Sequence, residues 1–346
     1  MSRFEIDWEI IPLKLKDVFT ISRGSKTEVP NVFLSISKDG FTGYGEAGPN
    51  TRYEETPEKV VKYFASLPPD FFDEIKSAEV LANKLDEWDT SKSVESVQSA
   101  KSAIEMAWLD WWAKSQIQPL WKLWGNETSI GPVTSYTIGL DTPAIMQAKI
   151  HKAEQYPVYK IKLGTDHDRE IIEAIREVTQ KPLRVDANEG WTTIKQAKRE
   201  IEFLSNQNVE LIEQPMPAAE FGMMKELKKW SPLPLAADES FIGDENLDEI
   251  SEAFHLINIK LMKIGSLVKA RKVIEKAHKI GLQVMIGCMI ESSLANAAGA
   301  LLALQADYAD LDGHLLISND PFIGLKVDKS GRVVLADAPG FGVERR

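Results

Sequence analysis

Three acidic residues follow successive apolar runs in the middle of the chain. Asp186 ends LRVD, Glu213 ends LIE and Asp238 follows LAA. If these runs are neighbouring parallel strands, the three carboxylates meet at one edge and repel one another strongly. A hard divalent cation would relieve the repulsion, and an oxygen-only ligand set favours Mg²⁺ or Mn²⁺. Asn188 and Glu239 would then orient the ligands. The alternative is that each acid caps the helix after its strand.

Lysines precede and follow these acids along the chain. Lys160 and Lys162 are two residues apart in one strand-like run, so their side chains face the same way, and Lys260 ends a later run. In an eight-stranded barrel, strands two and six are opposite each other, which places a lysine on each face of a substrate. Two opposed bases suit a 1,1-proton transfer beside a carboxylate, through an enediolate that the cation stabilises. The first two lysines could instead point to solvent, and Lys263 is expected to be an orienting or surface residue.

The base lysine must be neutral at the working pH. Burial, the neighbouring ammonium group and the cation would each lower its pKa.

A repeat of short strands and amphipathic helices must position these residues. Its eight strand-like runs are 133–139, 158–164, 183–187, 211–215, 235–240, 256–260, 283–287 and 308–313. Stretches with helical periodicity, such as 168–180 and 266–280, separate them. Eight strands alternating with helices predict a parallel (β/α) barrel, with its active site at the carboxyl ends of the strands. A doubly wound open sheet is the alternative, but the Gly-rich phosphate fingerprint is missing after the first strand.

The first 125 residues instead predict an α+β domain. Its expected elements are strands at 4–15, 31–37 and 41–48, turns at Arg23–Gly24 and Asp39–Gly40, and a helix at 94–116. The tail at 323–343 reads as a hairpin with a turn at 329–331 that packs back on this domain. We therefore expect a capping domain at 1–125, completed by 316–346, and a catalytic barrel at 126–315.

Composition excludes several classes of protein. The chain has 346 residues, a hydrophobic fraction of 43% and a formal net charge of −11, which disfavours nucleic acid and anionic membranes as partners. Cys288 is the one cysteine, so no internal disulfide can form and a reducing compartment is expected. No apolar segment has the length of a signal peptide core or a membrane span, which predicts a cytoplasmic protein.

Five motifs together resemble the muconate-lactonizing subgroup of the enolase superfamily. They are KIK (160–162), VDAN (185–188), EQP (213–215), ADES (237–240) and INIKLMKIG (257–265). The resemblance implies a modified TIM barrel, (β/α)₇β, with an N-terminal capping domain. It also implies one Mg²⁺ per subunit, with Mn²⁺ as a substitute, bound by the three acids named above. Lys162 and Lys260 would be the acid/base pair, and Lys160 would hold the substrate carboxylate and lower the pKa of Lys162.

The run YADLDGHLL resembles the dipeptide epimerases within this subgroup, through Asp310 and Asp312. Two carboxylates on one side of a strand can bind the ammonium group of a dipeptide. The alternative is that Asp312 and Gly313 form a turn and that Asp310 is a solvated neighbour. The resemblance implies an isomerase that inverts the α-carbon of the C-terminal residue of an Ala-Glu or Ala-Ala type dipeptide. Because members of the resembled family often form symmetric assemblies, it is also compatible with a homo-oligomer.

Four further residues are candidates for substrate contact. Arg23 matches a loop arginine of epimerases that act on Ala-Glu, although it could be a surface arginine. Thr137 ends the first strand, where its hydroxyl could equally be satisfied internally. Cys288 and Ile290 share a parity and are expected to line the pocket, although some relatives have Ser in place of the cysteine. Loops near 19–27 and 48–55 would cover the mouth.

Other functions remain open on the sequence alone. A cycloisomerase, an o-succinylbenzoate synthase or a racemase of N-acylated amino acids would use the same acids and lysines without an ammonium site. A catalytically silent metal-binding barrel and a Schiff-base lysine aldolase are the candidates from other classes.

Overall fold

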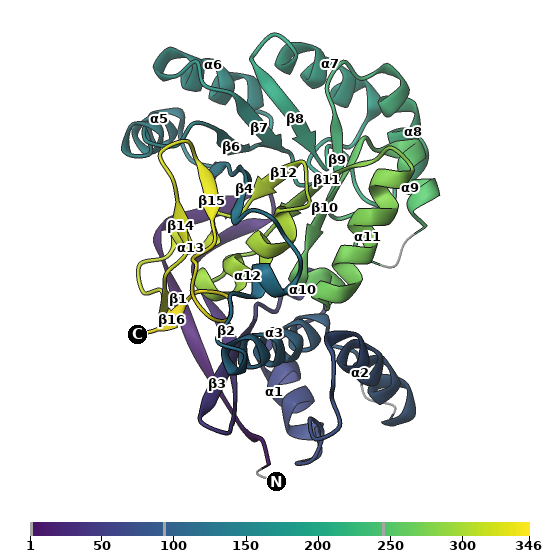
Figure 1. The fold of residues 1–346 in the computed structure, drawn as a ribbon. Helices are drawn as coiled ribbons and strands as arrows, with labels where there is room; N and C mark the ends of the chain where they lie inside the picture. Colours follow the sequence, from purple (N-terminus) through teal and green to yellow (C-terminus); the bar gives the residue numbers. More distant parts are fainter. Residues whose placement is uncertain (1–2, 93–94, 244–245) are drawn as a thin grey trace.

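The chain begins with a three-stranded antiparallel sheet packed against helices (Figure 1). The computed structural model describes residues 3–92, 95–243 and 246–346. The elements of this part are β1 (Glu5–Ile21), β2 (Gly24–Lys38), β3 (Phe41–Ala47), η1 (Thr51–Tyr53), α1 (Pro57–Ser66), α2 (Ala78–Lys92), α3 (Gln98–Ser115) and α4 (Leu120–Leu123). The helix predicted over 94–116 begins at Gln98, and Val94 lies outside the described residues.

Glycines in β3 allow α3 to approach the sheet closely. A Cβ atom at Gly43 would lie 2.1 Å from the carbonyl oxygen of Ala107, and one at Gly45 would lie 1.8 Å from that of Ala103. Any larger residue on the strand would push the helix away. The GYGEA sequence therefore determines how the capping sheet and its central helix pack.

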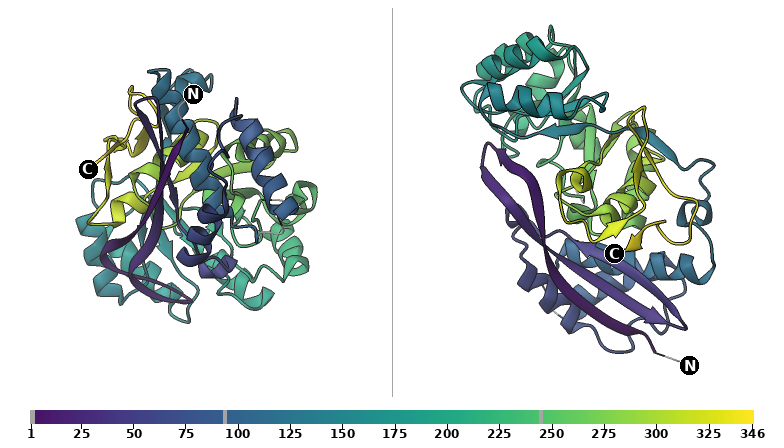
Figure 2. Two further views of the ribbon diagram at one scale, coloured as in Figure 1. Left: turned by 90° about the horizontal axis from the view of Figure 1, so that it is seen from below. Right: turned by 90° about the vertical axis from the view of Figure 1, so that its left-hand side faces the viewer.

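The β1–β2 hairpin is longer than its sequence predicted. β1 continues to Ile21 and β2 starts at Gly24, so the turn lies at Ser22–Arg23, one residue before the predicted position. The tip also binds the barrel, because the Thr20 carbonyl oxygen accepts a hydrogen bond of 2.8 Å from the Leu140 amide. Figure 2 (right) shows the hairpin running from the capping sheet to the barrel. The segment expected to be a loop over the mouth is thus the end of a hairpin.

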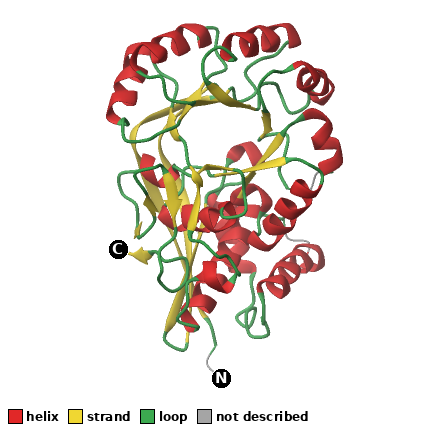
Figure 3. Cartoon of the chain, turned by 45° about the horizontal axis from the view of Figure 1, so that its top comes forward, coloured by secondary structure: helices red, strands yellow, loops and turns green. Residues whose placement is uncertain are grey.

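Eight parallel strands then form a barrel whose order follows the sequence (Figure 3). An isolated bridge between Thr134 and Ala309 joins the two edges. The strands are β5 (Tyr136–Ile138), β6 (Tyr159–Lys162), β7 (Leu183–Asp186), β8 (Val209–Glu213), β9 (Leu235–Ala237), β10 (Leu256–Lys260), β11 (Gln283–Gly287) and β12 (Tyr308–Asp310). The helices are α5 (Pro143–Lys152), α6 (Asp168–Val178), α7 (Ile194–Leu204), α8 (Phe221–Trp230), α9 (Leu247–Ala253), α10 (Leu261–Ile264), α11 (Leu267–Lys279), α12 (Ser293–Ala303) and α13 (Gly313–Leu316). The predicted barrel with a capping domain is confirmed.

Burial explains why these segments alternate. Every residue of β6, β7 and β10 is buried, as expected for parallel strands covered on both faces. Helices such as α6 bury one apolar stripe, here Ile171, Ile172 and Ile175, and expose the opposite face. Among the described residues, no helix has the length and apolar character needed to cross a membrane. The carboxyl ends of the strands are left to carry polar side chains.

The C-terminal segment contacts both parts of the chain. Its strands are β13 (Phe322–Ile323), β14 (Lys326–Val327), β15 (Arg332–Val334) and β16 (Glu344–Arg345), and β15 also pairs with β4 (Ile130–Val133). The predicted tail hairpin is formed by β14 and β15. The Phe322 ring packs 5.9 Å from Phe33 and 5.5 Å from Tyr44, so the tail covers part of the capping sheet.

Candidate active site

A cavity of about 480 Å³ lies at the carboxyl ends of the barrel strands, beneath the capping domain. Its walls come from the hairpin tip, the segment around η1 and the strand ends. Twelve of the residues singled out in the sequence line it: Arg23, Thr137, Lys160, Lys162, Asn188, Asp238, Glu239, Lys260, Cys288, Ile290, Asp310 and Asp312. Asp186 and Glu213 are fully buried within the same charged cluster. The structure therefore brings these residues together around one cavity.

Strand register places the three acids side by side. Asp186 pairs in register with Glu213, and Asp238 directly follows β9, the next strand. Burial, followed by the charges of the two aspartates, raises the pKa of Glu213 to about 8. This is the repulsion expected of clustered carboxylates.

The lysines flank this row of acids. The Lys162 Nζ lies 2.6 Å from Asp186 Oδ2, and the Lys260 Nζ lies 2.7 Å from Asp238 Oδ2. Lys160, also on β6, has its Nζ 2.7 Å from Glu213 Oε2 and 3.2 Å from Asp186 Oδ2. β6 and β10, which carry these lysines, are separated by the three acid-bearing strands β7, β8 and β9. An ammonium group therefore stands at each end of the carboxylate row.

The lysine pKa values depend on these carboxylates. Although burial opposes it, Asp238 and Glu213 hold the pKa of Lys260 well above its usual range. A base needs the opposite shift, so the low pKa predicted for a catalytic lysine requires another cation against the same carboxylates.

The acid row fits a hard divalent cation by its chemistry. Asp186, Glu213 and Asp238 offer only carboxylate oxygens, and Glu213 Oε2 is buried without any hydrogen bond, although it lies close to Lys160. Within the described ranges, no three acidic, histidine or cysteine side chains already stand in chelating geometry. The lysine ammonium groups lie against the carboxylates instead. These acids remain predicted ligands.

Residues that hold the acids in place were only partly foreseen. The Gln214 Oε1 accepts hydrogen bonds of 3.0 Å from the amides of Asp238 and Ser240, and Gln214 adopts a positive φ of 36°. Lys263 is buried and donates to Asp238 Oδ1 at 2.7 Å. Asn258 Nδ2 donates to Glu213 Oε1 at 2.9 Å. Only the position of Lys263, three residues after Lys260, hinted at such a role.

Asp310 and Asp312 lie on the opposite wall. Asp310 Oδ2 is 2.6 Å from the Lys160 Nζ, and Asp310 Oδ1 accepts a 2.5 Å hydrogen bond from the Ser135 hydroxyl. Asp312 Oδ2 accepts a 2.6 Å hydrogen bond from the Thr137 amide, and the Thr137 side chain also stabilises this carboxylate. Burial and the charge of Asp310 raise the pKa of Asp312 to about 6. Asp310 is therefore the counter-ion of Lys160, and Asp312 carries the less compensated carboxylate.

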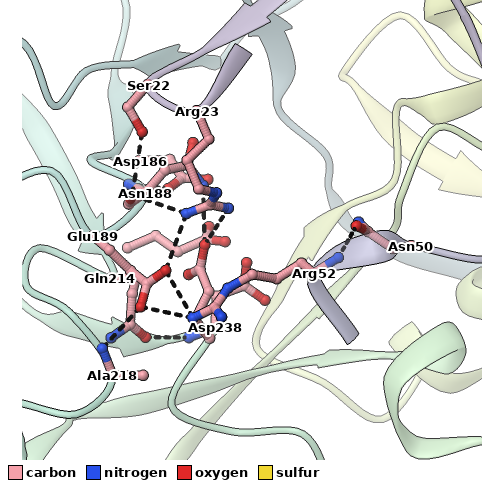
Figure 4. Close-up of polar contacts among 12 residues, drawn as sticks. Ser22, Arg23, Asn50, Arg52, Asp186, Asn188, Glu189, Gln214, Ala218 and Asp238 are labelled. Carbon is pink, nitrogen blue, oxygen red and sulfur yellow. Dashed lines mark hydrogen bonds and ion pairs between the residues drawn. The ribbon is translucent and has the colours of Figure 1, made fainter. Parts of the chain in front are cut away.

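Two arginines from the capping domain reach over the mouth (Figure 4). Arg23 Nη2 lies 2.7 Å from Glu239 Oε1, and its Nη1 donates to the Asn188 carbonyl oxygen at 3.0 Å. The Asn188 amide in turn donates to Asp186 Oδ1 at 2.9 Å. Arg52, which the sequence did not single out, pairs with Glu189 Oε2 at 3.0 Å, and Arg23 reaches the same oxygen at 3.2 Å.

Cys288 and Ile290 line the cavity from the segment after β11. The Cys288 thiol donates to the Asp310 carbonyl oxygen at 3.3 Å, and burial raises its pKa well above the usual range. A protonated thiol is a poor nucleophile, which supports a lining role for the half-buried Cys288.

Comparison with known proteins matches both parts of the chain. Residues 8–125 match the N-terminal domain family of mandelate racemase / muconate lactonizing enzyme, and residues 145–346 match the family described as enolase C-terminal domain-like. The L-Ala-D/L-Glu epimerase of Bacteroides thetaiotaomicron is 39% identical over 332 residues, which cover 96% of this chain and 85% of that protein.

Solved structures agree with this similarity. A substrate-liganded complex of the L-Ala-D/L-Glu epimerase from Bacillus subtilis has a TM-score of 0.89 at 27% identity and covers 99% of each chain. A dipeptide epimerase from Cytophaga hutchinsonii, complexed with Mg and D-Ala-L-Val, has a TM-score of 0.88 at 26% identity and covers 100% of this chain and 96% of that one.

Proposed function

The chain belongs to the mandelate racemase/muconate lactonizing enzyme group of the enolase superfamily, and we propose that it is a Mg²⁺-dependent dipeptide epimerase. It is an isomerase that inverts the α-carbon of the C-terminal residue of a dipeptide. The observation that carries this proposal is the row of three carboxylates with a lysine at each end, beside a cavity that also holds two aspartates.

The two lysines supply the proton transfer. Lys162 Nζ and Lys260 Nζ approach the α-carbon from opposite sides, so one removes the proton and the other delivers its own to the other face. Inversion follows because the proton leaves and returns on different faces. Lys160 contributes positive charge toward the substrate carboxylate.

One Mg²⁺ per chain is proposed, because the described residues contain one such row of acids. Asp186, Glu213 and Asp238 would hold the ion, which when bound stabilises the negative charge that builds on the substrate carboxylate. Mn²⁺ accepts the same oxygen ligands and is expected to substitute for it.

The N-terminal ammonium group of the dipeptide is proposed to bind at Asp312, with Asp310 beside it. Both carboxylates are buried and line the cavity, and Asp310 is already compensated by Lys160. A cation is therefore more strongly stabilised next to Asp312, because this carboxylate has no cationic side chain paired with it among the described residues and its pKa is raised by burial and by Asp310.

The side chain of the inverted residue is proposed to face Arg23, which favours glutamate as in Ala-Glu. Support comes from the arginine's place on the cavity wall and from the name of the Bacteroides relative. In the present arrangement Arg23 is bound to Glu239 and Glu189. If those ion pairs persist, neutral dipeptides of the Ala-Ala type become the better substrates.

We also propose that residues 316–346 complete the capping domain formed by 1–125. The support is the packing of Phe322 on the capping sheet and the ion pair from Arg345 to Glu9.

A library of L,L-dipeptides, incubated with the protein and Mg²⁺ in D₂O, tests the proposed function. Dipeptide substrates should gain one deuterium at the C-terminal α-carbon and yield the epimer, as read by mass spectrometry and chiral chromatography. Activity should disappear with a chelator and return with added Mg²⁺. Exchange of N-acyl amino acids alone, or conversion of succinylbenzoate precursors alone, would overturn the dipeptide assignment.

A further inference from the structure

The segment 288–291, between β11 and α12, forms one wall of the cavity. Cys288, Met289 and Ile290 line the cavity, and Glu291 Oε1 accepts a 2.7 Å hydrogen bond from the Met289 amide. This segment has no strand or helix of its own. Its position therefore depends on contacts with neighbouring elements.

Two side chains of the capping domain bond to this wall: Asn50 Nδ2 lies 3.6 Å from Met289 Sδ, and Asn31 makes the shorter contact with the backbone. The Asn31 Nδ2 on β2 donates to the Ile290 carbonyl oxygen at 3.0 Å and to Glu46 Oε1 on β3 at 2.8 Å. Asn31 is buried and lines the cavity itself.

Glu46 in turn is bonded to the start of α12. Its carboxylate accepts hydrogen bonds from the Ser292 amide at 2.9 and 3.2 Å and from the Ala295 amide at 3.3 Å, and the Ser292 hydroxyl also donates to it. A fully buried carboxylate is tolerated where such donors satisfy it, and a helix N-terminus favours negative charge. Glu46 therefore ties β3, the Asn31 amide and α12 into one network.

We infer that Asn31 and Glu46 are positioning residues through which the capping domain sets the 288–290 wall of the substrate site. The inference rests on the proposed dipeptide epimerase activity. Without this network, the Ile290 carbonyl loses its donor and the wall can shift relative to the strand ends. The effect falls on substrate binding, because the lysines and acids stand on other strands.

Asp320 offers a matched control on the same helix. It accepts hydrogen bonds from the Ser293 amide at 3.0 Å and from the Ser293 hydroxyl at 2.6 Å. It therefore caps α12 as Glu46 does. Unlike Glu46, it belongs to the C-terminal segment and has no hydrogen bond to Asn31 or to residues 288–290. Its removal weakens the helix start while leaving the link from Asn31 to Ile290 intact.

The test compares Asn31→Ala, Glu46→Gln and Asp320→Ala in the full-length protein with Mg²⁺ and the best dipeptide from the library. Asn31→Ala should raise KM about tenfold, with kcat within about twofold of the parent. Glu46→Gln keeps the shape and one acceptor oxygen, so a smaller rise in KM is expected. Because Glu46 is fully buried, that rise cannot come from a lost substrate contact. Asp320→Ala should lower Tm and leave KM unchanged.

Hydrogen exchange of a peptide covering 286–292 gives a readout independent of activity. Exchange should rise in Asn31→Ala and Glu46→Gln relative to Asp320→Ala. An unchanged KM in an active Asn31→Ala or Glu46→Gln enzyme, or an equal rise in Asp320→Ala, would overturn the inference. If the parent protein epimerises no dipeptide but exchange responds as expected, the proposed function fails while the positioning network stands. If exchange also fails to respond, the network itself is wrong.

Discussion

The charged residues at the strand ends and those at the mouth are held in different ways. Lys162 and Asp186 lie on neighbouring strands, in register and almost completely buried. Arg23 and Arg52 come from a hairpin tip and a short 3₁₀ turn, with side chains that are 37% and 43% exposed. Exposed ion pairs contribute at most about 1 kcal/mol, whereas breaking a buried pair costs about 3–5 kcal/mol.

The difference indicates a division of labour. The strand ends keep one arrangement because the sheet register dictates it, which suits groups that must act on a single carbon atom. The mouth is built by segments that lie outside the barrel sheet, so its arginines can exchange Glu189 or Glu239 for a substrate group. Chemistry should therefore be sensitive to the barrel residues, and substrate choice to the capping domain.

The largest effect is expected at the strand ends. Lys162→Ala and Lys260→Ala should each lower the epimerisation rate by about 10²–10⁴-fold, because each removes one of the two proton-transfer groups. Each variant should still exchange the α-proton of only one stereoisomer in D₂O, as followed by NMR. Lys198→Ala, on the outer surface of α7, is the control and should be fully active. Normal epimerisation by either site variant would refute the two-base mechanism.

A smaller loss is expected at the cavity wall. Asp312→Asn keeps an oxygen that can accept from the Thr137 amide but removes the charge proposed to bind the ammonium group. KM for the dipeptide should rise roughly tenfold to a hundredfold, and an N-acyl analogue should be affected much less. Steady-state kinetics on both compounds provide the measurement. Equal losses for the two would remove the ammonium assignment.

At the mouth, the effect should depend on the substrate. Arg23→Ala should raise KM for Ala-Glu about tenfold and change kcat/KM for Ala-Ala only slightly, because only the glutamate side chain carries the matching charge. Arg52→Ala is the comparison, since it shares Glu189 with Arg23. If both variants lose kcat/KM for Ala-Glu equally, or if Arg23→Ala loses kcat/KM equally for Ala-Glu and Ala-Ala, Arg23 acts through the overall positive charge of the mouth and not through a specific contact with the glutamate.

The smallest effect on catalysis is expected away from both regions, at the domain interface. Glu105 of α3 is fully buried, with Oε1 bonded to the Val268 amide at 2.8 Å and Oε2 without a partner. Burial raises its pKa to about 7. A carboxyl with a raised folded-state pKa contributes stability that is complete below its unfolded pKa of 4.5 and is lost as the pH rises through about 7.

Glu105→Gln should therefore remove a pH-dependent loss in the free energy of unfolding, on the order of 1–3 kcal/mol between about pH 4.5 and 7, and so flatten the fall in Tm over that range, with little change in kcat. Thermal unfolding at several pH values measures this. Glu202→Gln, exposed on α7, should keep the parent's pH dependence. A parent-like slope in Glu105→Gln would show that this carboxyl does not titrate in that range.

Much of the barrel could be predicted because each strand corresponds to a short apolar run in the sequence. The predicted run 256–260 matches β10 residue for residue, and the run 183–187 exceeds β7 by one residue, since buried parallel strands favour short, largely apolar sequence. The extension of the two hairpin strands escaped prediction because only Val18, Phe19 and Ile21 are apolar within residues 16–27, and the tip gains its order from Leu140 and Asn188 on the barrel. Arg52 could not be found for the same reason, because its partner Glu189 is far away in the sequence.

The sequence by itself determined the order of the strands, the acids and lysines at their ends, and the resemblance that names the chemistry, because spacing and polarity repeat with the βα unit. Only the tertiary structure decided that Lys160 pairs with Asp310 rather than serving the acid row alone, and that Lys263 is buried against Asp238. It alone revealed that Asn31 and Glu46 reach the 288–290 wall. These contacts join residues far apart in the chain, and no local pattern encodes which distant partner a buried polar group will meet.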